Sequence, residues 1–271
     1  MTFSIVGRDS STGDLGVAVA SKVLGVGAAV PAARLGLGAI ATQSFANTLY
    51  KRDGLAALAD GLDADATLAR LLAADELREE RQVGVVDDAG GGATFTGASC
   101  MQWAGGITGP DVAIQGNILV GPQVVDAMHT AWTAAADASL ARRLYAALVA
   151  GDRAGGDRRG RQSSALFVVS EVGGYTPGDD VAYDLRVDDH TDPVGELGRL
   201  LDIHDVLFKA PSTEDLLPLQ GDLAWEVRQR LQAAGYKDLD GFAGVENLEL
   251  RLRDGWIDKT VLRMLRSQTE R

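Results

Sequence analysis

The predicted strands come in runs and do not alternate with helices, and this order constrains the fold more than any other feature of the chain. Residues 3–8 and 15–21 are β-rich and flank a Thr-Gly-Asp turn, a pattern typical of an antiparallel hairpin. Nearly continuous apolar runs over 25–30 and 36–43, with Pro31 between them, predict a third and a fourth strand buried on both faces. Later strands are predicted over 81–87, 93–97, 111–119, 164–170 and 182–187.

Helical segments separate these runs of strands. Leucines at helical spacing predict two helices within 53–73, the second capped by Asp65. Residues 121–148 predict one long Ala-rich helix, and residues 192–205 predict another. Runs of strands between such segments indicate an α+β fold with antiparallel sheets, and two sheets between helix layers accommodate the number of strands.

A change in composition predicts two domains. Prolines, Ser212 and Thr213 fall in a linker over 209–220, after a large domain over 1–208. The remainder, 221–271, is a small helical unit with amphipathic helices expected over 221–234 and 256–265. So short a unit buries little apolar surface by itself.

Charge and cysteine content narrow the function classes. The 271 residues carry a formal net charge of −12, which disfavours binding to nucleic acid through phosphate neutralisation. The single Cys100 forms no internal disulfide and fits a reducing compartment. The sequence has neither a signal-peptide pattern nor an apolar stretch that could span a membrane. We therefore expect a cytoplasmic homo-oligomer that acts on a small molecule, without a nucleic acid or membrane partner.

Thr2 is the first candidate catalytic residue. Removal of Met1, which is expected before a small residue, would leave a threonine with a hydroxyl nucleophile and a free α-amine. Because an α-amine has a pKa of about 8, it can accept the hydroxyl proton without a histidine. The alternative is that Thr2 is only a β-branched residue at the start of a strand.

Two polar segments at strand ends are further candidates. Ser21 and Lys22 end the second strand, where the lysine ammonium can lower the pKa of the Thr2 amine; a solvated lysine is the alternative. Thr42 and Gln43 close the fourth strand and form either a pocket floor or a satisfied turn.

Gln115, Gly116 and Asn117 interrupt an apolar strand. Glycine permits close approach of the backbone, and an asparagine amide is a donor of the kind that stabilises an oxyanion. A β-bulge whose amides bond neighbouring strands explains the same three residues.

The Gly-rich segment 155–164 contains three arginines. Arg158 and Arg161 can bind a substrate carboxylate, or they can pair with Asp157, Asp188 and Asp189. The segment lacks the Gly-Lys-Ser/Thr ending of a phosphate-binding loop. The aspartates around 184–192 do not have EF-hand spacing, so we expect neither a metal nor a cofactor.

Seven motifs in order resemble a bacterial and archaeal family, domain of unknown function 1028. They include Thr-Phe-Ser-Ile-Val at 2–6, Thr-Gly-Asp-Leu-Gly-Val-Ala-Val-Ala-Ser-Lys at 12–22 and Ala-Thr-Gln at 41–43. Gln-Gly-Asn follows at 115–117. The others are Arg-Gln-Val-Gly-Val-Val-Asp at 81–87, the Gly-Gly-Asp segment at 155–163 and Asp-Leu-Arg-Val-Asp-Asp-His at 184–190.

The resemblance implies an N-terminal-nucleophile (Ntn) hydrolase, whose fold is a four-layer αββα sandwich, with Thr2 as nucleophile and Lys22 as helper. It also implies that 221–271 is similar to a peptidoglycan-binding unit. We therefore expect an amidohydrolase that cleaves the C–N bond of a small, anionic amide or cyclic amide, with Asn117 at the oxyanion. The alternative is a non-catalytic assembly or ligand-binding protein that retains the Ntn fold.

Overall fold

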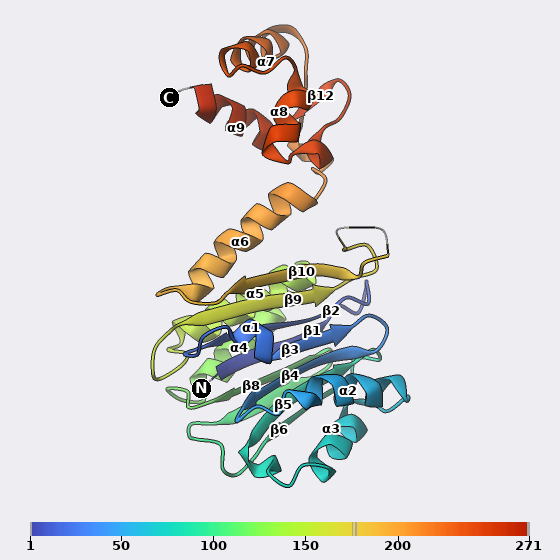
Figure 1. Ribbon diagram of the computed structural model, residues 1–271, viewed down its shortest axis with the longest axis vertical. Helices are drawn as coiled ribbons and strands as arrows, with labels where there is room; N and C mark the ends of the chain where they lie inside the picture. The colour runs from blue at the N-terminus through green and yellow to red at the C-terminus, as the bar shows by residue number, and fades with distance from the viewer. Residues whose placement is uncertain (1, 175, 177, 270–271) are drawn as a thin grey trace. The chain divides into compact units, whose positions relative to one another are not determined.

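The computed structural model describes residues 2–174, 176 and 178–269, and it divides into two compact units. The first unit is Met1–Arg199 and the second is Leu200–Arg271. The division falls within helix α6 (Pro193–Phe208), upstream of the linker predicted at 209–220. The first unit contains two antiparallel sheets, and the second is mostly helical (Figure 1). The expected removal of Met1 concerns a residue that lies outside the described ones.

The larger sheet of the first unit has the strand order β10-β9-β2-β1-β8-β7, and all neighbouring strands are antiparallel. The predicted hairpin of the first two strands is confirmed, and β1 lies centrally between β2 and β8. The short, glycine-rich β7 escaped prediction because Gly-Gly-Ile-Thr-Gly lacks a strand-like pattern. The strands are β1 (Thr2–Arg8), β2 (Leu15–Ser21), β7 (Gly105–Gly109), β8 (Val112–Asn117), β9 (Ser163–Val169) and β10 (Val181–Val187).

The smaller sheet of the first unit has the order β3-β4-β5-β6, again antiparallel. The strands are β3 (Pro31–Arg34), β4 (Gly38–Ser44), β5 (Arg81–Asp87) and β6 (Gly92–Thr96). The strands predicted over 81–87 and 93–97 are confirmed, and they pair as the antiparallel neighbours β5 and β6.

The two sheets pack face to face through their alternating apolar side chains. Val17 and Val19 of β2 share one buried cluster with Ala39 and Ala41 of β4. On the outer face of β4, Ile40 packs in a second cluster with residues of the helices α2 (Leu49–Ala59) and α3 (Ala64–Ala73). Strict alternation thus gives β4 one face toward the other sheet and one face toward helices.

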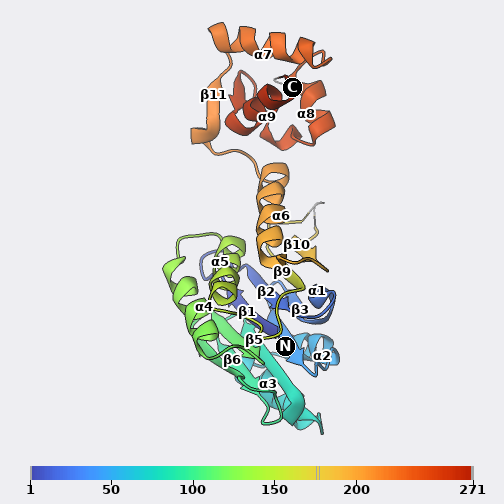
Figure 2. The ribbon, with the colours of Figure 1, turned by 90° about the vertical axis from the view of Figure 1, so that its left-hand side faces the viewer.

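Helices α4 (Gln123–Ala134) and α5 (Leu140–Arg153) cover the outer face of the larger sheet. A Cβ added at Gly7 of β1 would lie 2.6 Å from the Trp132 ring, so only glycine permits this close contact of strand and helix. In Figure 2 these two helices lie on the left of the sheets and α2 lies on the right.

Three predictions about local structure were wrong. Residues 25–30 are not a strand, because Gly25 has a left-handed φ of 64° and opens the short helix α1 (Val26–Ala29). The long helix predicted over 121–148 is two helices, and α5 folds back onto α4 so that both cover the sheet. The cap of α3 is Asp63 and not Asp65: its carboxylate accepts from the Ala66 N–H at 2.8 Å.

The expectation that so short a unit buries little apolar surface by itself was wrong: the second unit has its own apolar core, which includes Val227, Phe242 and Leu265. Helix α7 (Gly221–Ala233) agrees with prediction, whereas α8 (Leu239–Glu246) was not predicted. The helix predicted over 256–265 begins only at Lys259, as α9 (Lys259–Thr269). The three residues before it form β12 (Trp256–Asp258), which pairs with β11 (Leu216–Pro218). The 3₁₀ turns η1 (Arg78–Glu80), η2 (Thr213–Asp215) and η3 (Glu249–Arg251) complete the elements.

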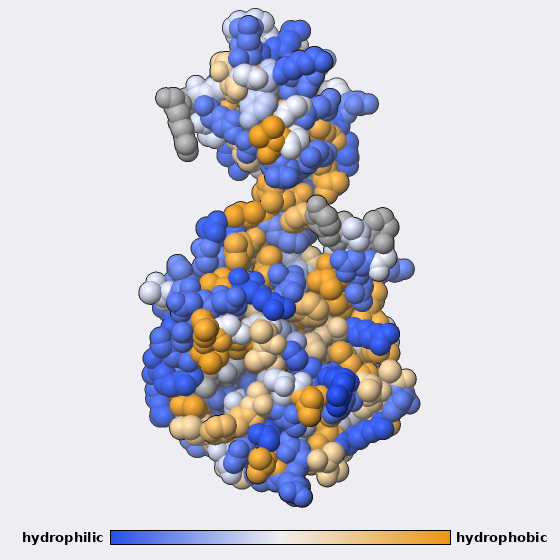
Figure 3. Space-filling view, in the orientation of Figure 1, coloured by the Kyte–Doolittle hydropathy of each residue, from blue (hydrophilic) through white to orange (hydrophobic). Residues whose placement is uncertain are grey.

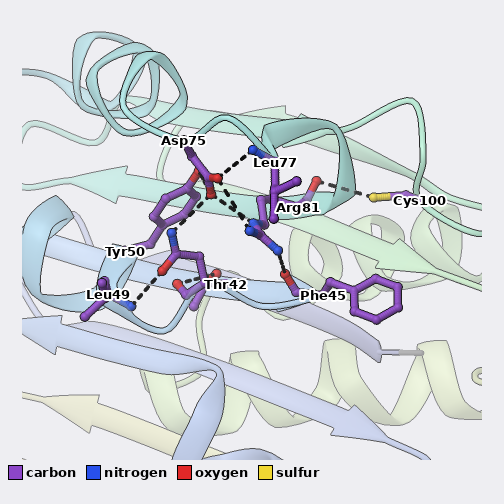
Figure 4. Close-up of polar contacts among 9 residues, drawn as sticks. Thr42, Phe45, Leu49, Tyr50, Asp75, Leu77, Arg81 and Cys100 are labelled. Carbon is purple, nitrogen blue, oxygen red and sulfur yellow. Dashed lines mark hydrogen bonds and ion pairs between the residues drawn. The ribbon is translucent and has the colours of Figure 1, made fainter.

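A buried ion pair attaches the helices of the smaller sheet to its strands (Figure 4). Asp75, after α3, accepts from the Arg81 guanidinium of β5 at 2.9 Å. Asn47 and Tyr50, at the start of α2, donate to the same carboxylate at 3.1 and 2.9 Å. The Arg81 hydrogen bonds hold the pKa of the Asp75 carboxyl well below its ordinary value of 3.8, and burial raises the pKa of Tyr50.

The pKa shift of Asp75 predicts how stability depends on pH. Because the pKa of Asp75 is depressed in the folded state, its ionised carboxylate stabilises the fold at pH values above the ordinary pKa of 3.8. This stabilisation is lost as the pH falls below 3.8. We expect Asp75→Asn to lower the free energy of unfolding by about 3 kcal/mol at pH 7, since it breaks a buried pair. Below about pH 4 the difference in the free energy of unfolding between Asp75→Asn and the wild type should become smaller.

Urea unfolding at several pH values measures this gap. Asp60→Asn is the matched control, because its pair with Arg70 is exposed, with side chains 59% and 56% accessible. The control should cost less than about 1 kcal/mol. Equal costs at the two positions, or a gap that is independent of pH, would contradict the role assigned to Asp75.

Candidate active site

Strand register aligns three of the predicted site residues in one row. Thr2 of β1 pairs with Ser21 of β2 on one side and with Asn117 of β8 on the other. The Thr2 and Ser21 hydroxyl oxygens lie 3.1 Å apart. All three residues are buried. Positions 2, 21 and 117, far apart in the sequence, thus meet at one end of the larger sheet because register pairs residues side by side.

The smaller sheet contributes two glutamines to this row. The Gln43 amide of β4 donates to the Thr2 carbonyl oxygen at 3.3 Å. The Gln82 carbonyl oxygen of β5 accepts from the Gln43 amide and from the Asn117 amide, both at 2.8 Å. The Gln82 amide nitrogen in turn donates to the Gly116 carbonyl at 2.7 Å. Gln82 therefore fixes the Asn117 side chain with its nitrogen toward the second sheet.

Gln115 and Ser4 extend the same polar network one step further between the sheets. The Gln115 amide donates to the Ser4 hydroxyl at 2.6 Å, and that hydroxyl donates to the Gln43 carbonyl oxygen at 2.7 Å. A Cβ at Gly84 would lie 2.1 Å from the Gln115 side chain, so the glycine makes room for this amide. Each amide of this buried network is hydrogen bonded. Burying a polar group in a low-dielectric interior costs the least free energy when the group has a hydrogen-bond partner.

Ser4 and Gln82 belong to this network, although neither was predicted as a site residue. The available signal was alternation: Ser4 follows Thr2 at strand spacing, so both side chains face the same side of β1. Gln82 lies near the start of β5, directly before the apolar residue Val83, and a fully buried glutamine is unusual. The pairing of Gln82 with Asn117 across two sheets carries no signal in the sequence.

The backbone turns sharply directly after Asn117. Ile118 has a φ of 50°, a left-handed conformation that is costly for a β-branched residue. Its N–H donates to the Met101 carbonyl at 2.8 Å, and the next N–H, of Leu119, donates to the Trp103 carbonyl at 3.0 Å. These bonds hold the strained turn and end β8 at the candidate site.

Thr42 does not join the site, although it adjoins Gln43. Its hydroxyl donates to the Asn47 carbonyl at 3.2 Å, on the face of β4 that carries α2. Successive residues of a strand point to opposite faces, so only one of the two can face the other sheet. Of the two explanations for this strand end, a satisfied turn fits Thr42, and a polar site fits Gln43.

Lys22 lies beside the row but binds elsewhere. Its backbone N–H donates to the Asp157 carboxylate at 2.9 Å, and its ammonium donates to the Arg161 carbonyl at 3.1 Å on the exposed surface. The lysine thereby attaches the Gly-rich segment to the end of β2. Its effect on the Thr2 amine stays a prediction.

The arginines of the Gly-rich segment pair with nearby carboxylates. Arg161 binds Asp152 of α5 through two bonds of 2.7 and 2.8 Å, and Arg159 lies 3.3 Å from Asp157. Arg161 therefore pairs with Asp152, which sequence analysis did not name. The Arg158 side chain is exposed, and the backbone N–H of this residue donates to the Ile118 carbonyl oxygen beside the end of β8.

Ser21 also borders a pocket of about 390 Å³. Phe3, Arg153 and Arg161 line it together with Pro193 at the start of α6. The pocket places two arginines and the serine that contacts Thr2 around one cavity.

In the part of the chain that the structure describes, no three His, Cys, Asp or Glu residues come together as metal ligands. Among the same residues, no helix combines the length and the apolar character needed to cross a bilayer.

The network makes a prediction about stability. Gln82→Leu keeps the volume but leaves the Gln43 and Asn117 amides and the Gly116 carbonyl without this partner. Since each unsatisfied buried group costs about 1–3 kcal/mol, we expect a loss of at least about 3 kcal/mol in the free energy of unfolding. Gln123→Leu, at an exposed position of α4, is the control and should change stability by less than about 0.5 kcal/mol. Similar urea midpoints for both variants would show that the network contributes little.

Comparisons with known proteins follow the division of the chain. A model for a family of unknown function, DUF1028, matches residues 2–197, and a model for a putative peptidoglycan binding domain matches residues 207–265. The crystal structure of protein SPO2555 from Silicibacter pomeroyi, described as DUF1028, is similar with a TM-score of 0.68 and 30% sequence identity. The match covers 84% of this chain and 94% of that chain. No curated protein matches the chain. The chain therefore belongs to DUF1028, a family of unknown function.

Proposed function

We propose that the protein is an N-terminal-threonine amidohydrolase that cleaves a C–N bond of a small, anionic amide or cyclic amide. The observation that carries the proposal is the row formed by Ser21, Thr2 and Asn117, with the Thr2 hydroxyl 3.1 Å from that of Ser21. A hydroxyl nucleophile, a second hydroxyl and an amide donor lie side by side in it. These are the groups that acyl transfer requires once Thr2 has a free amine.

The reaction begins with attack of the Thr2 hydroxyl oxygen on the amide carbonyl carbon. The α-amine of Thr2, freed by removal of Met1, takes the hydroxyl proton and passes it to the leaving nitrogen as the C–N bond breaks. Water then attacks the resulting ester, giving one proton to the amine. The carboxylic acid leaves, and the Thr2 oxygen regains its proton. Two half-reactions thus consume one water for each amide cleaved.

Asn117 is the proposed oxyanion donor. One N–H of its amide is committed to the Gln82 carbonyl oxygen, which leaves the other for the developing negative charge. The Gln82 bond holds the donor in place before the substrate arrives, and such preorganisation is what makes an oxyanion site effective. Lys22 remains the proposed source of positive charge near the amine, and Arg158 or Arg161 the partner of a substrate carboxylate.

The packing of the first unit supports an Ntn-type fold for this chemistry. We propose that α4 and α5, the two sheets, and α2 and α3 correspond to the αββα sandwich of Ntn hydrolases. Clusters between the sheets and between the smaller sheet and its helices are consistent with that order. In such a sandwich the nucleophile lies at the start of a central strand, at the end of the sheet, and Thr2 lies at the start of β1 between β2 and β8.

The proposal predicts the effect of changes at Thr2. In protein from which Met1 has been removed, as checked by intact mass, Thr2→Ala should abolish turnover on a panel of small amides and cyclic imides. Thr2→Ser should keep partial activity, because it retains both the hydroxyl and the amine but loses the methyl that restricts the rotamer. Neither variant should cost more than about 1 kcal/mol of stability.

Ser11→Ala, in the exposed turn between β1 and β2, is the control and should be fully active. Wild-type turnover by Thr2→Ala, or retention of Met1 on most molecules, would eliminate Thr2 as the nucleophile. The alternative, a non-catalytic assembly or ligand-binding protein, is indifferent to the removal of Met1.

A second prediction concerns the arginines. With a carboxylate-bearing substrate from the same panel, we expect Arg158→Ala or Arg161→Ala to raise KM about tenfold, which corresponds to about 1.4 kcal/mol of lost binding, with little change in kcat. Because the Arg161 side chain is 48% exposed, its pair with Asp152 should contribute less than about 1 kcal/mol to stability. Arg199→Ala removes a comparable exposed pair with Glu196 and serves as the control. Unchanged KM in both variants would refute carboxylate binding by this segment.

A further inference from the structure

Large apolar side chains are exposed at the end of the sandwich that carries Thr2. Seven of them share this location and expose between 44% and 67% of their surface. We call them the end patch. They are Val23, Leu24, Phe45, Leu49, Leu77, Met101 and Val120.

Strand register explains why these residues gather at one end. The patch residues lie in the segments that directly follow the ends of β2, β4, β6 and β8 or precede the start of β5. In the larger sheet the ends of β2 and β8 flank the start of β1. In the smaller sheet the end of β4 pairs with the start of β5, and β5 with the end of β6. Contacts of Gln43 with Thr2 and of Gln82 with Asn117 place the two sets of ends together.

Hydrogen bonds fix part of the patch in position. Arg81 donates to the Phe45 carbonyl at 2.6 Å, and the Leu77 N–H donates to Asp75 at 2.9 Å. Figure 4 shows the side chains of Phe45, Leu49 and Leu77 arranged around this ion pair. The backbone at these two patch positions is therefore held in place before the patch is covered, which lowers the entropy cost of binding there.

The extent of the patch matches what a protein interface needs. Contiguous exposed apolar patches above a few hundred Å² are rare in monomers and mark interaction sites. A large apolar side chain that is about half exposed has on the order of 100 Å² of accessible surface that a partner can bury. Seven of them supply most of the roughly 800 Å² that each partner buries in an ordinary complex. In Figure 3, single apolar residues lie among polar ones on the left-hand side of the first unit, where the N-terminus lies in Figure 1.

Charges around the patch favour a second copy of the same chain. The protein carries a formal charge of −12, so two copies repel each other over most of their surfaces. At this end exposed cations and carboxylates are interspersed: Arg78 lies 3.7 Å from Glu79, and Lys22 and Arg158 are exposed in neighbouring loops. A mixed surface is self-complementary, as a two-fold symmetric interface requires.

We propose that the protein forms a two-fold symmetric dimer through the end patch. Each copy buries the apolar residues of the other around the end of the sandwich, and the Thr2 end of each subunit lies at the interface. This inference does not depend on the proposed catalytic chemistry, because it rests on exposed apolar area, strand register and charge.

Sedimentation equilibrium of the full-length protein tests the proposal. The wild type should have twice the mass of the chain at micromolar concentration. Leu24→Asp and Phe45→Asp each place a carboxylate in the patch at exposed positions and should raise the dimer Kd at least tenfold, which corresponds to about 1.4 kcal/mol. Val172→Asp is the matched control, because Val172 is 94% exposed but follows β9 at the opposite end of the strands.

The expected pattern is a dimeric wild type, a dimeric Val172→Asp and two dissociated patch variants with unchanged melting temperatures after correction for protein concentration. A monomeric wild type would overturn the proposal, leaving the patch for another ligand. Dimers of wild-type strength in both patch variants, or dissociation of Val172→Asp, would also overturn it.

Discussion

Buried amides of Gln43, Gln82 and Gln115 join the two sheets, and the candidate site depends on them. Their hydrogen bonds connect the Thr2 carbonyl, the Ser4 hydroxyl and the Asn117 amide across the interior. A glutamine in an apolar core is costly unless each of its groups is bonded, so the network tolerates few alternative arrangements. The same bonds that relieve this cost hold Asn117 and the start of β1 in one geometry.

The Asp75–Arg81 pair performs a similar task on the outer side of the smaller sheet. There a carboxylate with a depressed pKa binds groups from α2 and β5. Ionic and amide networks thus flank β4 and β5 near the same sheet end. This rigid end is where the strained Ile118 turn, the Gly-rich segment and the end patch also lie. Backbone strain and exposed apolar surface are both features that are typical of functional sites.

Several elements of the site were predictable from patterns in the sequence. Thr2, Ser21 and Asn117 lie at ends of strands that alternation and turn residues identify, and β1 and β2 form the expected hairpin. Thr42 was not placed correctly with them, because its face of β4 depends on where the strand begins. The pairing of Arg161 with Asp152 was not predicted, since it requires the end of α5 to lie beside the Gly-rich segment.

The sequence by itself determined the antiparallel strands, the division into a large and a small unit, and the candidate nucleophile. These depend on local periodicity, turn residues and the chemistry of single side chains, all of which act over a few residues. Only the tertiary structure decided that Gln82 orients Asn117, that Thr42 faces the helices and that the seven exposed apolar residues of the end patch share one end. Those facts depend on which strands pair and how two sheets face each other. Packing over long sequence separations fixes both, and a local pattern contains no information about it.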